Sequence, residues 1–325
     1  MDASNRRESE KEEWWRPRAE FVAQYVAEEL RKSDVILLQE WWLRPEFEHI
    51  FDYHTSPYFT RVAERRPGRE DGMAVLIKKE GSLELLESLP IITAPQRIAQ
   101  LVHCRDKENR YFGIANVHLS FPSSSDMLVN ERRQTNEVKK AVRGFARLSS
   151  SNRLEVLGGD FNSNSGGLAA RTMETNHGFV NCASCIAEQV LSQTGGQVNL
   201  GITHRTHRGE EVSVDHIFAR ITDGHDDASR TLGYLDALGT RVVDCRRGDL
   251  DLDGCSFSSK EECSLDIISD HRPVTATLEW PSHTSIASRA LSTAASFDMG
   301  YCNFPLDPLE PPSYMGLNAT LIGLR

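Results

Sequence analysis

The stretch Gly158–Asn164, GGDFNSN, follows directly on the apolar run 154–157, which reads Leu-Glu-Val-Leu. A short β-type run that breaks into two glycines predicts a strand whose end turns sharply and approaches a ligand closely. Asp160 and Asn162 lie two residues apart in this turn, so the carboxylate can take a proton from water while the amide donates to a nearby oxygen. The pattern favours a catalytic turn, although an Asx turn that only closes a buried strand has the same residues.

The spacing of apolar residues divides the chain into helices and strands. It predicts helices at 12–32, 44–53, 127–148 and 168–175. Apolar runs and turn residues predict strands at 35–40, 73–77, 96–103, 111–118, 154–157, 212–218 and 275–280. Mixed helices and strands in this order indicate an α/β fold.

Acids and histidines recur where these predicted strands begin or end. Glu40 ends the run 35–40, His118 ends the run 111–118, Asp215 lies in the run 212–218, and Asp270-His271 precede the last strand. Each of them alone has an ordinary structural explanation, as a surface acid or a hydrogen-bonded histidine. Because α/β sheets keep their sites at strand ends, the repeated placement indicates one shared site.

Two loops carry further candidate sites. The turn 204–208 holds two histidines and two arginines as potential phosphate donors, although an exposed polar turn explains it equally well. These residues are His204, Arg205, His207 and Arg208. The run 249–254, DLDLDG, resembles the opening of an EF-hand, with Asp249, Asp251 and Asp253 as candidate calcium ligands. The match fails at position 12, which is Lys260, so an acidic surface turn is the alternative interpretation.

Composition describes an ordinary globular protein. The 325 residues fit one large α/β domain or two small ones, and no run of about 18 apolar residues predicts a membrane span. A net charge of -10 argues against a protein that coats nucleic acid by bulk electrostatics. Clustered carboxylates can nevertheless hold divalent cations that meet a phosphate substrate. The seven cysteines form no disulfide framework, and the charged segment 1–10 lacks the apolar core of a secretory signal, which favours an intracellular location.

The motifs LLQE, NVHL, GGDFNSN, SVDHIF and SDHRPV follow one another between residues 14 and 280. In this order they resemble the endonuclease/exonuclease/phosphatase superfamily. The runs DGMAVLIKK, RIAQLVH and THRTHRGEEVSVDHIF look similar to its eukaryotic branch of deadenylase-like nucleases and to plant members that carry EF-hands. The resemblance implies a four-layer α-β-β-α sandwich of two mixed sheets.

The resemblance also implies a set of roles. A Mg²⁺ or Mn²⁺ ion would bind Glu40 with assistance from Asp270. Asp160 would activate water, and His271, oriented by Asp215, would stabilise the pentacovalent transition state. The residues that would bind the scissile phosphate are Asn162 and His118.

Family members normally begin with a strand that carries an asparagine and precedes the first helix. This sequence begins with a charged segment instead, so we expect a catalytic domain over 1–282 without that strand, with an insertion at 221–268. The Ser-, Ala- and Pro-rich residues 283–325 predict a weakly structured tail.

Together these features predict a divalent-metal-dependent phosphodiester hydrolase acting on RNA or DNA. A phosphatase or phospholipase C-type enzyme acting on an inositol phosphate, sphingomyelin or a nucleotide shares the same core chemistry. An inactive calcium-responsive interaction module is the alternative from a different class, because of the DLDLDG run and the missing strand.

Overall fold

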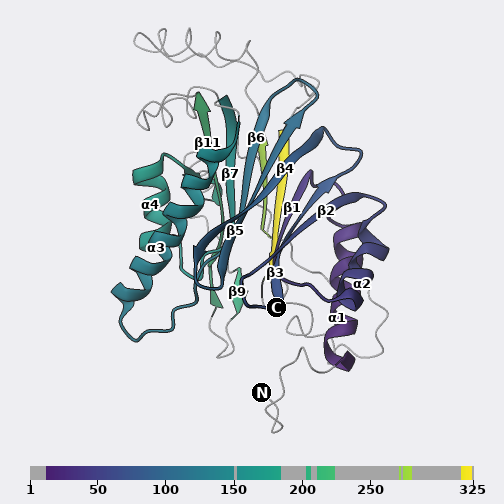
Figure 1. The fold of residues 1–325 in the computed structure, drawn as a ribbon, viewed down its shortest axis with the longest axis horizontal. Helices are drawn as coiled ribbons and strands as arrows, with labels where there is room; N and C mark the ends of the chain where they lie inside the picture. The colour runs from purple at the N-terminus through teal and green to yellow at the C-terminus, as the bar shows by residue number, and fades with distance from the viewer. Residues whose placement is uncertain are drawn as a thin grey trace, which may run out of the picture.

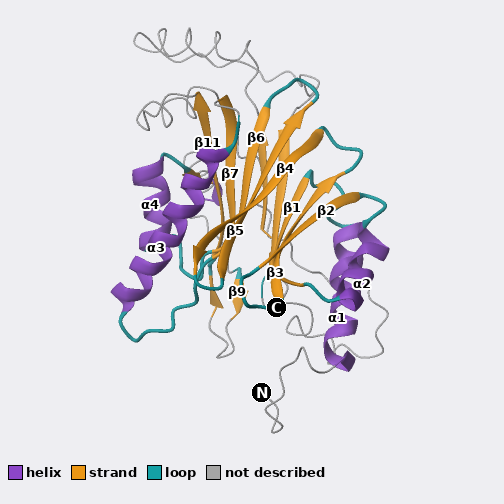
Figure 2. Cartoon of the chain, viewed as in Figure 1, coloured by secondary structure: helices purple, strands orange, loops and turns teal. Residues whose placement is uncertain are grey.

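A computed structural model describes residues 12–149, 152–183, 203–205, 211–223, 271, 274–279 and 316–323. Within them, two mixed sheets pack face to face between two pairs of helices (Figure 1). Figure 2 shows helices α1 and α2 on one side of the strands and α3 and α4 on the other. This arrangement confirms the predicted four-layer α-β-β-α sandwich.

The first sheet has the strand order β12-β13-β1-β3-β2, in which only β13 and β1 pair in parallel. Its strands are β1 (Val35–Trp42), β2 (Phe59–Arg65), β3 (Asp71–Lys78), β12 (Val274–Glu279) and β13 (Gly316–Gly323). The helices that cover its outer face are α1 (Glu12–Glu28) and α2 (Pro45–Thr55).

The second sheet has the order β4-β5-β6-β7-β11-β8, in which only β6 and β7 pair in parallel. Its strands are β4 (Leu83–Ala94), β5 (Arg97–Asp106), β6 (Tyr111–His118), β7 (Asn152–Asp160), β8 (Val180–Asn181) and β11 (Asp215–Asp223). The helices on its outer face are α3 (Met127–Gly144) and α4 (Leu168–His177). Strands β9 (His204–Arg205) and β10 (Glu211–Val212) form a separate short pair.

The apolar runs arise because the central strands are buried on both faces. In β1, Val35 and Leu37 belong to the core between the sheets, whereas Ile36 and Leu38 pack with α1 and α2. A strand that lies between two hydrophobic cores needs apolar side chains on both of its faces. The predicted strand 35–40 was recognisable for this reason.

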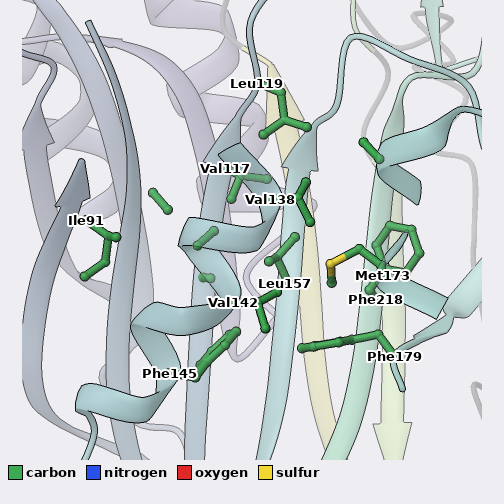
Figure 3. Packing of buried hydrophobic residues seen from close by; sticks show 14 of the residues in the cluster. Ile91, Val117, Leu119, Val138, Val142, Phe145, Leu157, Met173, Phe179 and Phe218 are labelled. Atoms are coloured by element: carbon green, nitrogen blue, oxygen red, sulfur yellow. The ribbon is translucent and has the colours of Figure 1, made fainter. Parts of the chain in front are cut away.

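The outer core under α3 and α4 holds the second sheet in place. Val138 and Val142 of α3 and Met173 of α4 point toward Leu157 of β7 (Figure 3). Helix α3 begins after Asp126, whose carboxylate accepts hydrogen bonds from the backbone N–H groups of residues 128 and 129. This capping interaction fixes where the helix begins.

The sequence predicted the edge strand β12 but missed the edge strands β2, β4 and β8. β2 and β4 are edge strands with many half-buried or exposed positions, so they lack a continuous apolar run. Strand β11 also runs to Asp223, so it includes the first three residues of the predicted insertion.

The C-terminal strand β13 is the main difference from the prediction. Within the tail 283–325, residues Gly316–Gly323 form an interior strand between β12 and β1, drawn in yellow in Figure 1. Leu317 and Ala319 are buried, and the Thr320 hydroxyl shares a 2.7 Å hydrogen bond with Ser33. The strand that pairs in parallel with β1 is therefore β13, the last strand of the described chain.

Truncation of Leu317 tests this strand. Leu317 belongs to the core between the sheets, so Leu317→Ala should lower the free energy of unfolding by about 2–4 kcal/mol. The matched control Leu86→Ala changes an exposed leucine of β4 and should stay within about 0.5 kcal/mol of the wild type. Urea unfolding measures both, and equal effects would place β13 outside the core.

Candidate active site

Three strand ends of the second sheet meet at one level. In the parallel pair β6–β7, His118 lies opposite Asp160, and in the antiparallel pair β7–β11, Asp215 lies opposite Asp160. The backbone N–H of Leu119 donates to the Asp160 carbonyl oxygen at 2.8 Å. The topology therefore brings together three of the predicted residues that are far apart in sequence.

Four buried side chains form a continuous line here. The His271 Nδ1 lies 3.0 Å from an Asp215 carboxylate oxygen, and His271 Nε2 lies 3.9 Å from Asp160 Oδ2. His118 Nε2 approaches the same Asp160 oxygen at 3.6 Å. An ionised carboxylate only accepts hydrogen bonds, so the contact with Asp215 places a proton on His271 Nδ1. The other ring nitrogen then faces Asp160.

Asp160 is set up to exchange a proton near neutral pH. Burial raises its pKa to about 7, and the charges of Asp215 and Glu40 act in the same direction. The charge of His271 and the hydrogen bond from the Asn162 backbone act against this rise without cancelling it. A carboxylate of this kind can take a proton from water.

The turn after β7 fixes Asp160 by its backbone. The backbone N–H of Asn162 donates to Asp160 Oδ1 at 2.6 Å, which is an Asx turn, and Asn162 has a positive φ of 49°. The Asn162 side-chain amide donates to the Leu119 carbonyl oxygen at 2.9 Å. The Asx turn and the cluster of functional groups thus coexist in the same residues.

Glu40 reaches the site from the opposite sheet. It lies at the bulge between Gln39 and Trp41 with a positive φ of 57°, and it is only half-buried. Its charge acts on Asp160. At the preceding residue, Gln39 Nε2 donates to Asn116 Oδ1 at 2.6 Å and so joins β1 to β6. The two sheets are therefore tied together where the acids approach one another.

The remaining predicted residues are placed only in part. The His204 ring in β9 packs against the His271 ring, with the centroids 4.2 Å apart, and Arg205 is described by its backbone alone. The others lie outside the described residues, namely Asp270, His207, Arg208, Asp249, Asp251 and Asp253.

The described donors suit a hard cation that also binds substrate. Among the described residues, no three His, Cys, Asp or Glu side chains group as a complete metal site. Mg²⁺ commonly takes one or two carboxylates and completes its shell with water and substrate phosphate. Glu40 offers such a carboxylate, and its charge acts on Asp160, whose pKa is raised mainly by burial and further by the charges of Asp215 and Glu40. The residues therefore fit this type of metal binding.

Three residues at the site were not recognised from the sequence. Gln134 of α3 donates to the carbonyl oxygens of Ser120 and Asn162, at 2.9 and 3.2 Å, and so connects two turns. Glu137 accepts from the Ser120 N–H and hydroxyl. Arg97 begins β5 and donates to the His118 carbonyl oxygen at 3.4 Å. Only the tertiary contacts reveal them, because each lies far from the motifs in sequence.

Two mixed sheets between helix layers, with acids and imidazoles gathered at one end, define this chain as an α-β-β-α sandwich protein. The model of the Endonuclease/Exonuclease/phosphatase family matches residues 15–271. The chain belongs to this family. The activities in the family's name all hydrolyse phosphate esters.

Individual relatives are distant. An uncharacterized calcium-binding protein of Arabidopsis thaliana is 25% identical over 205 residues, which cover 58% of this chain and 41% of that protein. The matched region thus spans less than half of that relative. The catalytic domain of human Nocturnin, solved with a bound sulfate anion, aligns with a TM-score of 0.50 and 18% identity over 64% of this chain and 76% of its own.

A family protein from Bacteroides vulgatus also has a TM-score of 0.50 and 18% identity, over 67% of this chain and 83% of its own. At these identities the two solved structures establish the fold alone. No helix in the described ranges has the length and apolarity needed to cross a bilayer.

Proposed function

We propose that this chain is a divalent-metal-dependent phosphodiester hydrolase that cuts RNA or DNA by in-line attack of water. The observation that carries the proposal is the position of Asp160, buried between His118 and His271 with its pKa raised to about 7. A carboxylate that is ionised near pH 7 and faces two imidazoles has the properties of a general base in phosphoester hydrolysis.

Each neighbouring group has a distinct task in this mechanism. Asp160 takes the proton of the attacking water. The His271 imidazole, held through Nδ1 by Asp215, meets the charge that develops on the phosphoryl oxygens. His118 and the Asn162 amide hold the phosphate in line with the water. No covalent intermediate is required, since water attacks phosphorus directly.

The metal would be held by Glu40, together with Asp270 as the family resemblance implies. When bound, Mg²⁺ or Mn²⁺ supplies positive charge to the phosphate oxygens and the leaving group. Glu40 approaches from the sheet opposite to that of Asp160, so the phosphate would lie between the two sheet ends.

Hydrolysis of a polyadenylate oligomer and of bis-p-nitrophenyl phosphate tests the proposal. Both reactions should proceed with Mg²⁺ and stop in EDTA. Glu40→Gln should raise the Mg²⁺ concentration for half-maximal rate by at least about 10-fold, because it removes the ligand charge. The control Glu46→Gln, on the exposed side of α2, should leave it unchanged.

Two results would contradict parts of the proposal. Full activity in EDTA would rule out the metal-dependent mechanism. Activity on an inositol phosphate or a nucleotide monoester, with none on the oligomer, would favour the phosphatase or phospholipase C alternative, because the family name includes phosphatases.

The calcium-responsive alternative has its own support in the named calcium-binding relative and in the acids at 249, 251 and 253. If it holds, Asp249→Ala should weaken calcium binding in a calorimetric titration by about 10-fold or more, because it removes a charged ligand. Equal calcium affinity in both proteins would exclude that site.

A further inference from the structure

Arg97 occupies a fixed position at the edge of the site. It is the first residue of β5 and follows the two-residue turn Pro95-Gln96, in which Gln96 has a φ of 59°. A proline followed by a residue with positive φ is the pattern of a type II turn, which leaves little freedom to the next residue. Since Ala99 lies opposite Val117 in the β5–β6 pair, Arg97 is level with the end of β6.

Acids from three other elements surround this arginine. The charges of Glu137 in α3, Glu40 in β1 and Asp160 in β7 all act on its guanidinium, and the charge of Arg69 opposes theirs. Burial also opposes the effect of the acids and lowers the Arg97 pKa from a value so high that the group stays charged. Arg97 is therefore a permanently charged, partly dehydrated cation that lies among the same acids as the proposed metal.

The Arg97 side chain makes a single hydrogen bond within the described chain, although its guanidinium is charged and partly buried. This bond is the long contact of 3.4 Å to the His118 carbonyl oxygen. Glu137 is engaged by Ser120, and one Asp160 oxygen is engaged by the Asn162 N–H. A guanidinium has five N–H donors in a planar fork, and phosphate oxygens match that geometry in pairs.

We propose that Arg97 binds the phosphate group of the substrate on the His118 side of the site. The inference rests on the proposed hydrolase function and extends it by naming a phosphate-binding residue outside the predicted set. The competing explanation is that Arg97 only offsets the charge of the surrounding acids. In that case its removal would alter stability without altering affinity for phosphate.

Inorganic phosphate is the probe that separates these explanations. Its dissociation constant is measured by calorimetry without substrate, and its inhibition constant is measured against bis-p-nitrophenyl phosphate. Arg97→Met should raise both constants by about 10- to 100-fold, because charge-assisted hydrogen bonds are lost. Arg97→Lys should recover part of the affinity. Arg105→Met, at the exposed far end of β5 where the side chain pairs with Glu84, is the matched control and should change neither constant.

The outcomes separate this inference from the hydrolase proposal. If the wild type hydrolyses neither substrate yet binds phosphate through Arg97, the phosphate site stands and the hydrolase proposal fails. If phosphate binding is unchanged in Arg97→Met, or absent from the wild type, the inference is wrong even where hydrolysis falls. Should Arg97→Met not fold, Arg97→Lys decides, because a loss above about 5-fold supports the bidentate contact and unchanged affinity refutes it.

Discussion

Asp160→Asn should lower hydrolysis by about 10³-fold and, at the same time, make the protein more stable at pH 8. The rate falls because an amide cannot take the proton of the attacking water. The stability rises because the wild type must keep a buried carboxylate charged at this pH. A merely structural acid would not produce this combination.

The sign follows from the direction of the pKa shift. The pKa of Asp160 is about 7 in the fold against an ordinary value of 3.8, so the folded state holds this proton more tightly than the unfolded chain. Between roughly pH 4 and 7 this group therefore makes the wild type less stable as the pH rises. Asn cannot ionise, so the variant does not lose stability in this way as the pH rises. We expect a gain of about 1–3 kcal/mol over the wild type at pH 8 and little gain below pH 4.

Urea unfolding at several pH values, combined with rates on bis-p-nitrophenyl phosphate, measures both effects. The control Glu80→Gln changes an exposed acid in a turn and should leave the rate and the pH dependence of stability as they are. If Asp160→Asn kept most of the hydrolysis rate, Asp160 could not be the general base. If Asp160→Asn were less stable at pH 8 than the wild type, burial of the ionised Asp160 carboxylate would not be destabilising the fold.

The predictable part of the fold is the part that is buried on both faces. Strand β6 has the predicted bounds 111–118, and α3 begins at the predicted residue 127, because apolar spacing and a capping aspartate mark them locally. Strand β13 escaped prediction because it follows a Pro- and Ser-rich segment and gains its burial only between β12 and β1. Its pairing depends on distant strands, which no local pattern contains.

The candidate active site was likewise predictable only in part. The strand-end rule predicted that His118, Asp160 and Asp215 converge, since strand ends can be read from the sequence once the strands are known. Arg97 is neither an acid nor a histidine and lies outside the motifs that hold the predicted site residues, and its place at the site depends on the register between β5 and β6. The roles of the loop residues that lie outside the described chain stay predictions.

Gly159→Ala should be the most damaging single substitution in the stretch Gly158–Asn164, with a loss above about 4 kcal/mol or failure to fold. Gly159 has a φ of 153°, which residues with a side chain rarely adopt. A Cβ built there would lie 1.8 Å from the Val117 carbonyl oxygen, a backbone atom of β6 that has no room to move. Strands β6 and β7 would have to separate where His118 faces Asp160.

The neighbouring Gly158→Ala provides the matched comparison. Its Cβ would meet a methyl carbon of Leu37 at 2.8 Å, and a side chain can shift, so the expected cost is about 1–2 kcal/mol. Urea unfolding with near-ultraviolet circular dichroism compares the two variants. If Gly159→Ala were as stable as Gly158→Ala, β6 and β7 could not approach so closely. Asp160 would then lack the backbone constraint that holds it beside His118, and the geometry on which the proposed chemistry depends would have to be rejected.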